Sequence, residues 1–218
     1  MILIIAPHPD DDIICCGGII SRNAYNVKVI YITDGSKGSP RHEEWGKELA
    51  LRRMREAYNA LSKLGIKNKD NIIFLGNEDG SVSRNFNKIR NQLLNLLQES
   101  RITEIYFPSP FDIHPDHSAI GKIVLSTIKE MSERRMSLYM YTIHRHSIVD
   151  VRNLPTVLRS LFLQLKIMLN WKYVCLKVDN PRLKVEALEF HESQVWYMSK
   201  KVKELTAKDY ECFYFKRI

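Results

Sequence analysis

Short apolar runs alternate with longer amphipathic stretches along the whole chain. Residues 1–6 and 27–32 are apolar runs rich in Ile and Val, which is typical of strands buried on both faces of a sheet. Further strands are predicted at residues 72–75, 104–107, 138–144, 173–178 and 212–216. Apolar side chains at helical spacing predict helices at residues 12–23, 43–64, 85–98, 118–131, 154–170 and 181–193. This alternation predicts an α/β protein in which helices cover both faces of a parallel sheet.

The length and composition favour one ordinary globular domain. The chain has 218 residues, of which 44% are apolar and 27% are charged. These fractions exclude low-complexity disorder, a collagen-like repeat or a coiled coil as the main architecture. No internal repeat, linker or shift in composition divides the chain, so we expect a single domain over residues 1–218.

The net charge changes this picture little. Lys and Arg exceed Asp and Glu by 33 to 25, which gives a charge of +8 and favours anionic partners in general. The basic residues are scattered along the chain rather than gathered in one run. We therefore expect no nucleic-acid partner.

The cysteines and the apolar runs indicate a protein of a reducing compartment. Cys15, Cys16, Cys175 and Cys212 include no CxxC pair, so neither a disulfide framework nor a cysteine zinc site is expected. The first apolar run lacks the basic flank and cleavage site of a signal peptide. No run approaches the ~18 apolar residues of a membrane span. A cytoplasmic location is therefore expected.

Two loops that follow predicted strands are dense in potential metal ligands. Residues 7–12 read Pro-His-Pro-Asp-Asp-Asp, and residues 112–117 read Asp-Ile-His-Pro-Asp-His. Open parallel sheets bind ligands beyond the carboxyl ends of their strands, so both loops can meet at one edge. Imidazole and carboxylate together suit zinc, whose catalytic sites commonly have three protein ligands and one open position.

The ligand chemistry allows a specific division of roles. His8 and Asp11 supply two ligands from one loop, and His117 supplies a third from the other. Asp10 is then free to take a proton from a bound water, and His114 is free to donate to an oxyanion or a leaving group. This is the outline of a zinc hydrolase for an amide or ester, although Fe²⁺ or Co²⁺ could occupy the same ligands.

A purely structural interpretation stands beside this one. Acidic residues ahead of a helix often act only as N-caps that interact with the helix dipole. A His-Pro-Asp-His turn can be structural for the same reason. Either motif alone is compatible with that interpretation, but the two together, each after a strand, favour the metal site.

The same residues resemble a known family. Residues 6–12 with Gly17-Gly18 resemble the AHPDDE…GG opening of the PIG-L/LmbE-like N-acetylglucosaminyl deacetylases, and residues 114–117 match the HPDH motif of that family. Weaker similarities follow in the family's order at Thr33-Asp34-Gly35, at Arg53, Glu56 and Leu64-Gly65, at residues 76–80, and at Lys184, Ala187, His191, Ser193 and Gln194. The resemblance implies a Rossmann-like three-layer α/β/α fold and zinc-dependent removal of acetyl from an N-acetylated amino sugar.

The resemblance carries over roles by position, and they agree with the ligand chemistry. It implies zinc ligands at His8, Asp11 and His117, a general base at Asp10, an oxyanion stabiliser at His114, and an imidazole-positioning carboxylate at Asp116. The chain departs from the family pattern at Pro7, where Ala is usual, and at Asp12, where Glu is usual. The shorter Asp12 side chain is expected to fall short of a partner beside the metal site.

Three further residues are candidates for contacts with the substrate: Arg53, Asp79 and His191. Each also has a structural interpretation. Arg53 can be solvated or paired with Glu56 three residues later. Asp79 can cap the turn before Gly80, and His191 can cap its helix. The structural interpretation is favoured for all three.

Residues 154–172 are the least explained segment. Leucines recur in it at helical spacing, and four basic residues fall roughly along one side. A basic amphipathic helix of this kind can lie on an anionic membrane surface. A helix that packs on the core or contacts a second subunit is the favoured interpretation, which leaves a homo-oligomer open.

The predicted function is removal of the acetyl group from an N-acetylglucosamine-type sugar, either a small molecule or a glycoconjugate. One alternative keeps the metal site and changes the substrate to another acyl amide or a thiol conjugate. A second alternative is a catalytically inactive protein that binds a sugar or an anion. A plain nucleotide-binding domain is disfavoured because no GxGxxG follows the first strand.

Overall fold

The computed structural model describes residues 1–99, 101–131, 135–144, 165 and 169–218. Within them a seven-stranded sheet has the order β3-β2-β1-β4-β5-β7-β6. The strands are β1 (Ile2–Ala6), β2 (Val27–Thr33), β3 (Ile72–Asn77), β4 (Glu104–Pro108), β5 (Ser137–Tyr141), β6 (Lys172–Lys177) and β7 (Tyr210–Arg217). Strands β1 to β5 pair in parallel, whereas β7 runs antiparallel to both of its neighbours. The sheet is therefore mostly parallel, as predicted.

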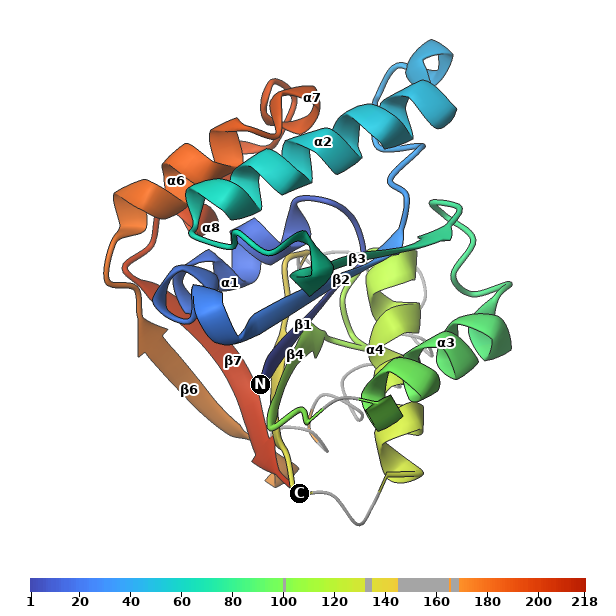
Figure 1. Cartoon of the computed structure of the whole chain (residues 1–218), viewed down its shortest axis with the longest axis vertical. Coiled ribbons are helices and arrows are strands. Elements are labelled where there is room, and N and C mark those ends of the chain that lie inside the picture. The colour runs from blue at the N-terminus through green and yellow to red at the C-terminus, as the bar shows by residue number, and fades with distance from the viewer. Residues whose placement is uncertain (100, 132–134, 145–164, 166–168) are drawn as a thin grey trace.

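Helices cover both faces of this sheet (Figure 1). One face carries α1 (Asp11–Arg22), α2 (Lys47–Lys63), α6 (Pro181–Glu189) and α8 (Lys200–Thr206), and the other carries α3 (Phe86–Glu99) and α4 (Pro115–Lys129). The short helix α7 (Glu192–Val195) follows α6, and single 3-10 turns lie at Ala24–Asn26, His42–Glu44 and Lys69–Asn71. The three-layer, Rossmann-like α/β/α architecture is confirmed.

Strand β1 shows why the first apolar run belongs at the centre of the sheet. All five of its residues are buried. Alternate side chains of a strand point to opposite faces, so Ile2 and Ile4 enter one core cluster while Leu3 and Ile5 enter the other. A strand with a helical layer on each side has no polar face, which explains why its sequence does not alternate.

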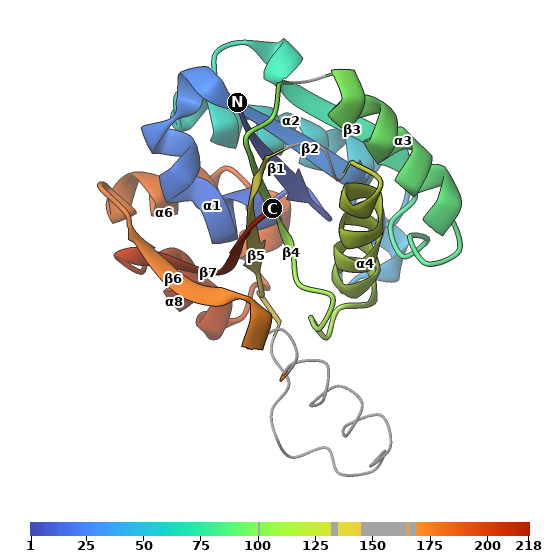
Figure 2. The ribbon, with the colours of Figure 1, turned by 90° about the horizontal axis from the view of Figure 1, so that it is seen from below.

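The loops after β1 and β4 are neighbours because of the strand order. From β1 the chain moves outward through β2 and β3, and then crosses back to β4 on the other side of β1 (Figure 2). Such a switch in direction leaves room beyond the carboxyl ends of the two central strands, and ligands bind there in open α/β sheets. The fold therefore brings together the two loops that carry the metal motifs.

Two predicted helices begin elsewhere than the apolar pattern indicated. The helix predicted at residues 43–64 begins at Lys47, because Gly46 adopts a φ of 124° that interrupts the preceding turn. The helix predicted from residue 118 begins at Pro115. Proline fits the first turn of a helix because the backbone N–H groups there have no acceptor within the helix, so the N–H that proline lacks is not needed. The Pro-Asp-His part of the second motif is thus helical, and His114 occupies the N-cap position.

The expectation that the chain contains no disulfide is wrong. Cys175 and Cys212 are joined by a disulfide, with their Cα atoms 4.0 Å apart. They are direct partners in the antiparallel register of β6 and β7. Their separation of 37 residues follows no short spacing rule, so only the strand pairing reveals the bond. Cys15 and Cys16 are free and buried in α1.

The segment predicted as a basic amphipathic helix, residues 154–172, lies outside the described residues except for residues 165 and 169–172. Its core, subunit-contact and membrane interpretations all stay predictions. Among the helices that are described, none has the length and apolar character needed to cross a membrane.

Candidate metal centre and active site

The loops after β1 and β4 bring the three predicted metal ligands together. His8 Nδ1 and His117 Nε2 each lie 3.2 Å from the same atom, Asp11 Oδ2. Asp11 opens α1 and His117 lies in the first turn of α4. All three side chains are buried. Two imidazole nitrogens and one carboxylate oxygen thus converge on one point.

These donors fit a divalent metal ion. Ligand atoms of His8, His114 and His117 lie within 4.8 Å of one another. Among the described residues, His114 Nδ1 is buried and has no hydrogen-bond partner. A buried polar atom without a partner is destabilising unless something binds it, and mixed imidazole and carboxylate donors suit zinc and, less selectively, Fe²⁺ or Co²⁺. The residues therefore form a candidate metal centre.

The electrostatics of the centre favour cations. Burial by itself lowers the pKa of His117, but Asp11 and Asp112 outweigh burial and raise it to about 9. In the same way Asp11, Asp116 and Asp79 raise the pKa of His8 well above its usual value in spite of burial. The carboxylates that attract these protons would equally attract a metal ion.

Asp10 has a backbone conformation unique among the described non-glycine residues, with a φ of 148°. Such conformations store about 1–3 kcal/mol of strain and persist only where the surroundings impose them, often at functional sites. Burial raises the pKa of the Asp10 carboxyl to about 6, although the charge of Arg53 opposes the rise. A carboxyl that titrates near neutral pH beside the metal donors is suited to accept a proton.

Arg53 ties the loop after β1, which carries Asp10, to the loop after β2. It is 2% exposed, and its Nη2 donates to the carbonyl oxygen of Pro9 at 2.9 Å and lies 3.3 Å from Asp10 Oδ1. Its Nη1 donates to the carbonyl of Gly35 at 3.1 Å. A Cβ at Gly38 would lie 1.8 Å from Nη1, so glycine is required there for the guanidinium to fit. The favoured interpretation of Arg53 as solvated or paired with Glu56 is therefore wrong.

Glu56 binds elsewhere. Its carboxylate accepts hydrogen bonds from Ser193 N at 2.9 Å and from Ser193 Oγ at 2.6 Å. It also pairs with the exposed Arg52 at 3.0 Å. Glu56 thus ties helix α2 to the start of α7, and it leaves Arg53 free to face the site.

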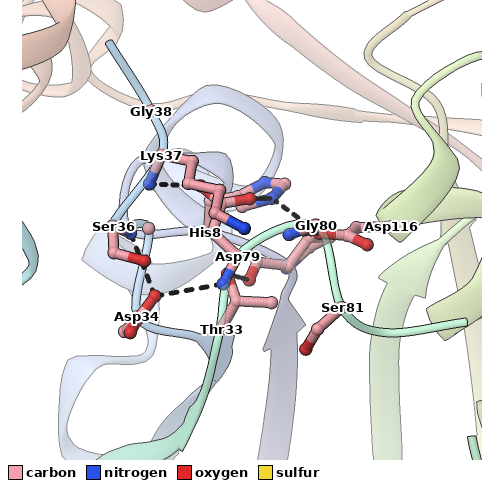
Figure 3. Close-up of polar contacts among 12 residues, drawn as sticks. His8, Thr33, Asp34, Ser36, Lys37, Gly38, Asp79, Gly80, Ser81 and Asp116 are labelled. Atoms are coloured by element: carbon pink, nitrogen blue, oxygen red, sulfur yellow. Dashed lines mark hydrogen bonds and ion pairs between the residues drawn. The ribbon is translucent and has the colours of Figure 1, made fainter. Parts of the chain in front are cut away.

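Asp79 lies in the site rather than capping its own turn. Its Oδ1 is 3.2 Å from His8 Nε2, and its Oδ2 accepts from the backbone N–H of Lys37 at 3.2 Å. Asp34 Oδ1 accepts the backbone N–H groups of Ser36 and Asp79, so it fixes the loops after β2 and β3 together (Figure 3). Contact with His8 outweighs burial and lowers the pKa of Asp79 to about 2.

Asp116 contacts an imidazole, but not the one next to it in sequence. Its Oδ2 accepts the backbone N–H of Gly80 at 2.8 Å and lies 3.5 Å from His8 Nε2. Asp116 and Asp79 thus both lie beside Nε2 of His8 (Figure 3). The predicted positioning carboxylate therefore faces the histidine of the other loop.

His114 and His144 extend the histidine cluster toward β5. The His114 ring lies 4.9 Å from that of His117 and 5.7 Å from that of His144, measured between centroids. Burial and the neighbouring His8 and His117 lower the pKa of His114 to about 4. His114 is thus neutral at pH 7. The sequence offered no pattern for His144, since it follows a strand without a motif.

Asp112 is a further functional candidate, for which the sequence pattern predicts no role. One carboxylate oxygen accepts the backbone N–H groups of Ile143 and His144 at 3.0 and 3.1 Å. The same oxygen lies 3.5 Å from His117 Nδ1, and the other accepts the N–H of His114 at 3.0 Å. Asp112 therefore links the loop after β4 to the end of β5 and faces a metal-ligand candidate. Its place in the ligand-rich loop was the available signal.

A cavity of about 430 Å³ opens onto these groups. Its polar and charged lining comes from the loops after β1 to β5 and from α2 and the α7–α8 region, at His8, Asp10, Asp11, Lys37, Arg53, Asp79, His114, His117, His144, Gln194, Tyr197 and Ser199. The cavity thus gathers the predicted base, the metal ligands, His114 and two of the three candidate substrate contacts.

Two other sequence candidates lie outside this cavity. His191 is fully buried, its ring nitrogens have no hydrogen-bond partner, and its side chain does not cap α7. Asp12 is also fully buried, but its Oδ2 accepts a hydrogen bond from the Tyr31 hydroxyl at 2.7 Å. Tyr31 on β2 thus satisfies one oxygen of Asp12, whereas Asp12 Oδ1 is buried with no hydrogen-bond partner among the described residues, and the missing partner beside the metal site stays a prediction.

Comparisons with known proteins agree with this geometry. A family model described as "PIG-L: GlcNAc-PI de-N-acetylase" matches residues 3–128, which include both metal motifs. A diacetylchitobiose deacetylase of Thermococcus kodakarensis is 31% identical over 133 residues, which are 58% of this chain and 48% of that protein. The chain thus matches about half the length of this curated relative.

Solved structures share the fold. The N,N'-diacetylchitobiose deacetylase of Pyrococcus horikoshii superposes with a TM-score of 0.69 at 21% identity, covering 100% of this chain and 83% of that one. A deacetylase of the teicoplanin biosynthesis pathway gives a TM-score of 0.69 at 15% identity, covering 100% of this chain and 98% of that one. At such identities the likeness establishes the architecture.

Proposed function

The chain belongs to the PIG-L family, and from that premise we propose that it is a metal-dependent hydrolase that removes the acetyl group from an N-acetylglucosamine-type sugar. The observation that carries the proposal is the meeting of His8, Asp11 and His117 beside Asp10. The names of the relatives supply the substrate class, since they are deacetylases of acetylated sugars.

His8, Asp11 and His117 would hold the metal, and zinc is the ion that this donor set suits first. When bound, the ion would acidify a water toward a pKa of about 7 and polarise the acyl carbonyl. Asp112 and Asp116 keep the two imidazoles in place from outside the centre.

The residues around the ligands divide the remaining work. Asp10 accepts a proton from the attacking water as the bond between water oxygen and acyl carbon forms. His114, which is neutral at pH 7, donates an N–H to the developing oxyanion. The C–N bond then breaks, and the proton that Asp10 took passes to the leaving nitrogen, so that acetate and a free amine result.

The polar side of the cavity would bind the sugar. Arg53 and Asp79 both line it and present a donor and an acceptor for ring hydroxyls, a pairing that discriminates strongly against ligands without them. His191 is buried away from the lining, so we assign it no contact with substrate. A cytoplasmic location stays a prediction, although the disulfide between Cys175 and Cys212 removes the cysteine argument for it. A single domain over residues 1–218 and a homo-oligomer also stay predictions.

The proposal is tested by acetate release from a panel of N-acetylglucosamine compounds, assayed as purified, after chelation and after zinc add-back. We expect activity that is lost on chelation and restored by zinc. No acetate from any compound, in protein shown to contain zinc, would move the assignment to another acyl amide or a thiol conjugate. No acetate and no bound zinc would favour an inactive protein that binds sugars or anions.

A further inference from the structure

Part of the cavity lining is apolar, which the proposed reaction on an acetyl group does not require. The apolar lining residues are Ile14, Ile143, Met198 and Val202, here called the apolar wall. They come from three separate parts of the chain: α1, the end of β5, and the α7–α8 region. They lie in a cavity whose other lining residues are mainly polar or charged.

The wall is part of the folded core and not a set of stray surface residues. Ile14 and Ile143 are only 4% and 6% exposed and belong to the core cluster under α1 and α2. Met198 and Val202 are partly buried and pack against the same cluster. Ile143 is also held by its backbone N–H, which donates to Asp112 at 3.0 Å. The wall is therefore in place before any substrate arrives.

Two polar lining residues and one residue of the wall lie toward opposite ends of the sheet edge. Lys37 and Asp79 follow β2 and β3, which lie on one side of β1, whereas Ile143 follows β5 beyond β4. Helix α8, which carries Val202, packs on α1 near β7 (Figure 2). Along the carboxyl edge of the sheet, Lys37 and Asp79 thus lie on one side of the metal donors, and Ile143 lies on the other side together with His144.

This order fixes which end of an amide faces the wall. The reacting carbonyl must lie over the metal donors, with the nitrogen on one side and the acyl substituent on the other. The sugar carries the nitrogen, and its hydroxyls match the hydrogen-bonding side at Arg53 and Asp79. The acyl substituent then points toward the wall.

We propose that the apolar wall is an acyl-binding subsite that accepts N-acyl groups longer than acetyl. The inference rests on the proposed hydrolase function and names its substrate class more closely: N-acyl amino sugars with a straight apolar chain. An acetyl group has one methyl, and four apolar side chains from three parts of the chain form a larger apolar surface than one methyl can cover. Each further methylene that leaves water against such a wall strengthens binding, by about two- to fourfold.

Binding to an inactive variant tests this without relying on turnover. Zinc-loaded Asp10→Asn protein is titrated with glucosamine carrying N-acetyl, N-butyryl or N-hexanoyl groups. We expect Kd to fall about two- to fourfold per methylene over the first additions. A parallel arm uses N-acetylglucosamine with a methyl or an octyl aglycone, for which we expect no such gain.

Matched variants locate the effect. In Asp10→Asn protein, Met198→Gln and Val202→Thr keep side-chain size but add polarity, and each should abolish most of the gain from acetyl to hexanoyl. The control is Val174→Thr on β6, the same exchange at a partly buried valine outside the cavity lining. It should keep the gain.

The outcomes separate the two proposals. A Kd that does not fall with acyl length, or that falls only with the octyl aglycone, overturns the acyl subsite. Acetate release by the wild-type enzyme then still supports the deacetylase function. A Kd that falls with acyl length, together with hydrolysis of the longer amides but not of acetyl, keeps the subsite and overturns the acetyl assignment.

Discussion

Arg53 and Asp10 are joined twice, through one guanidinium nitrogen. Arg53 Nη2 lies 3.3 Å from the Asp10 carboxylate and donates to the carbonyl of Pro9, the residue before it. The same nitrogen thus contacts both the side chain of Asp10 and the backbone that leads into its strained conformation. Because a strained φ persists only under restraint, Arg53 is the side chain best placed to supply that restraint.

Replacing Arg53 by Lys should lower kcat about 10- to 100-fold while the bound zinc is kept, because Lys retains the charge but not the planar fork that reaches both loops. The measurement is kcat alongside zinc content. Arg52→Lys is the matched control, since the Arg52 side chain is 51% exposed and pairs with Glu56 at the surface. We expect less than a twofold effect there, and equal losses in both variants would contradict the role of Arg53.

Asp10 and His117 should fail in different ways. Asp10→Asn should keep zinc and lose about 10²–10⁴-fold in turnover, the usual range for removal of a general base. His117→Ala should lose the metal itself, since a ligand is gone. Zinc content and acetate release are measured on both, with the exposed Asp70→Asn as control. Wild-type turnover in Asp10→Asn would rule out Asp10 as the base.

Asp112→Asn should weaken zinc binding about 10- to 100-fold, because an amide cannot hold His117 as a carboxylate does and it turns an N–H₂ toward backbone donors. Competition with a chromophoric chelator gives the zinc Kd. The melting temperature of the zinc-free protein separates the alternatives. A lower melting temperature with an unchanged zinc Kd would mean that Asp112 only joins the loops.

His191 should make the protein sensitive to acid. Burial, with the charge of Arg53 nearby, lowers the pKa of His191 to about 3, against an ordinary value of 6.5. Between these values the unfolded chain binds the extra proton, so the free energy of unfolding rises with pH and is lost as pH falls from 6.5 toward 3.

His191→Leu should therefore reduce the dependence of unfolding free energy on pH by about 1.4 kcal/mol per pH unit near pH 5. Urea unfolding at a series of pH values across this window measures the slope. A slope equal to that of the wild type would show that other groups carry the acid sensitivity.

Loss of the disulfide should affect stability and spare activity. The bond between Cys175 and Cys212 closes a loop with a sequence separation of 37. Removing such a restraint from the unfolded chain destabilises the fold by about 4 kcal/mol. Urea unfolding should show this loss in Cys175→Ser/Cys212→Ser and in reduced wild type alike, with kcat unchanged because neither residue lines the cavity. If the urea unfolding curve of the wild-type protein is the same with and without reductant, the prediction is contradicted.

The meeting of the candidate metal ligands could be predicted because they lie in short motifs that follow strands. His8 and Asp11 follow β1, and His117 follows β4 in the first turn of α4, so strand order alone brings them together. The fold class follows from the alternation of apolar runs and amphipathic stretches, and it is confirmed.

Long-range partners could not be predicted. Arg53 reaches Asp10 from another element, and Tyr31 meets Asp12 only because β2 lies beside β1. Ser193 donates a hydrogen bond to Glu56 across a separation of 137 residues. Glu56 is therefore not the partner of Arg53 that the local spacing suggested. Such contacts depend on how distant segments pack together, and no local sequence pattern indicates that packing. The same holds for the cysteine pair, which the strand register alone specifies.

The place of β7 between β5 and β6 has a consequence for synthesis of the chain. Strand β6 is made before β7, yet β7 is the neighbour with which it pairs in the described sheet. Until residues 210–217 have emerged, both β6 and the outer edge of β5 present unpaired N–H and C=O groups, which are templates for association with other chains. A nascent or prematurely ended polypeptide is therefore exposed to misassembly at this edge, and the last strand closes it.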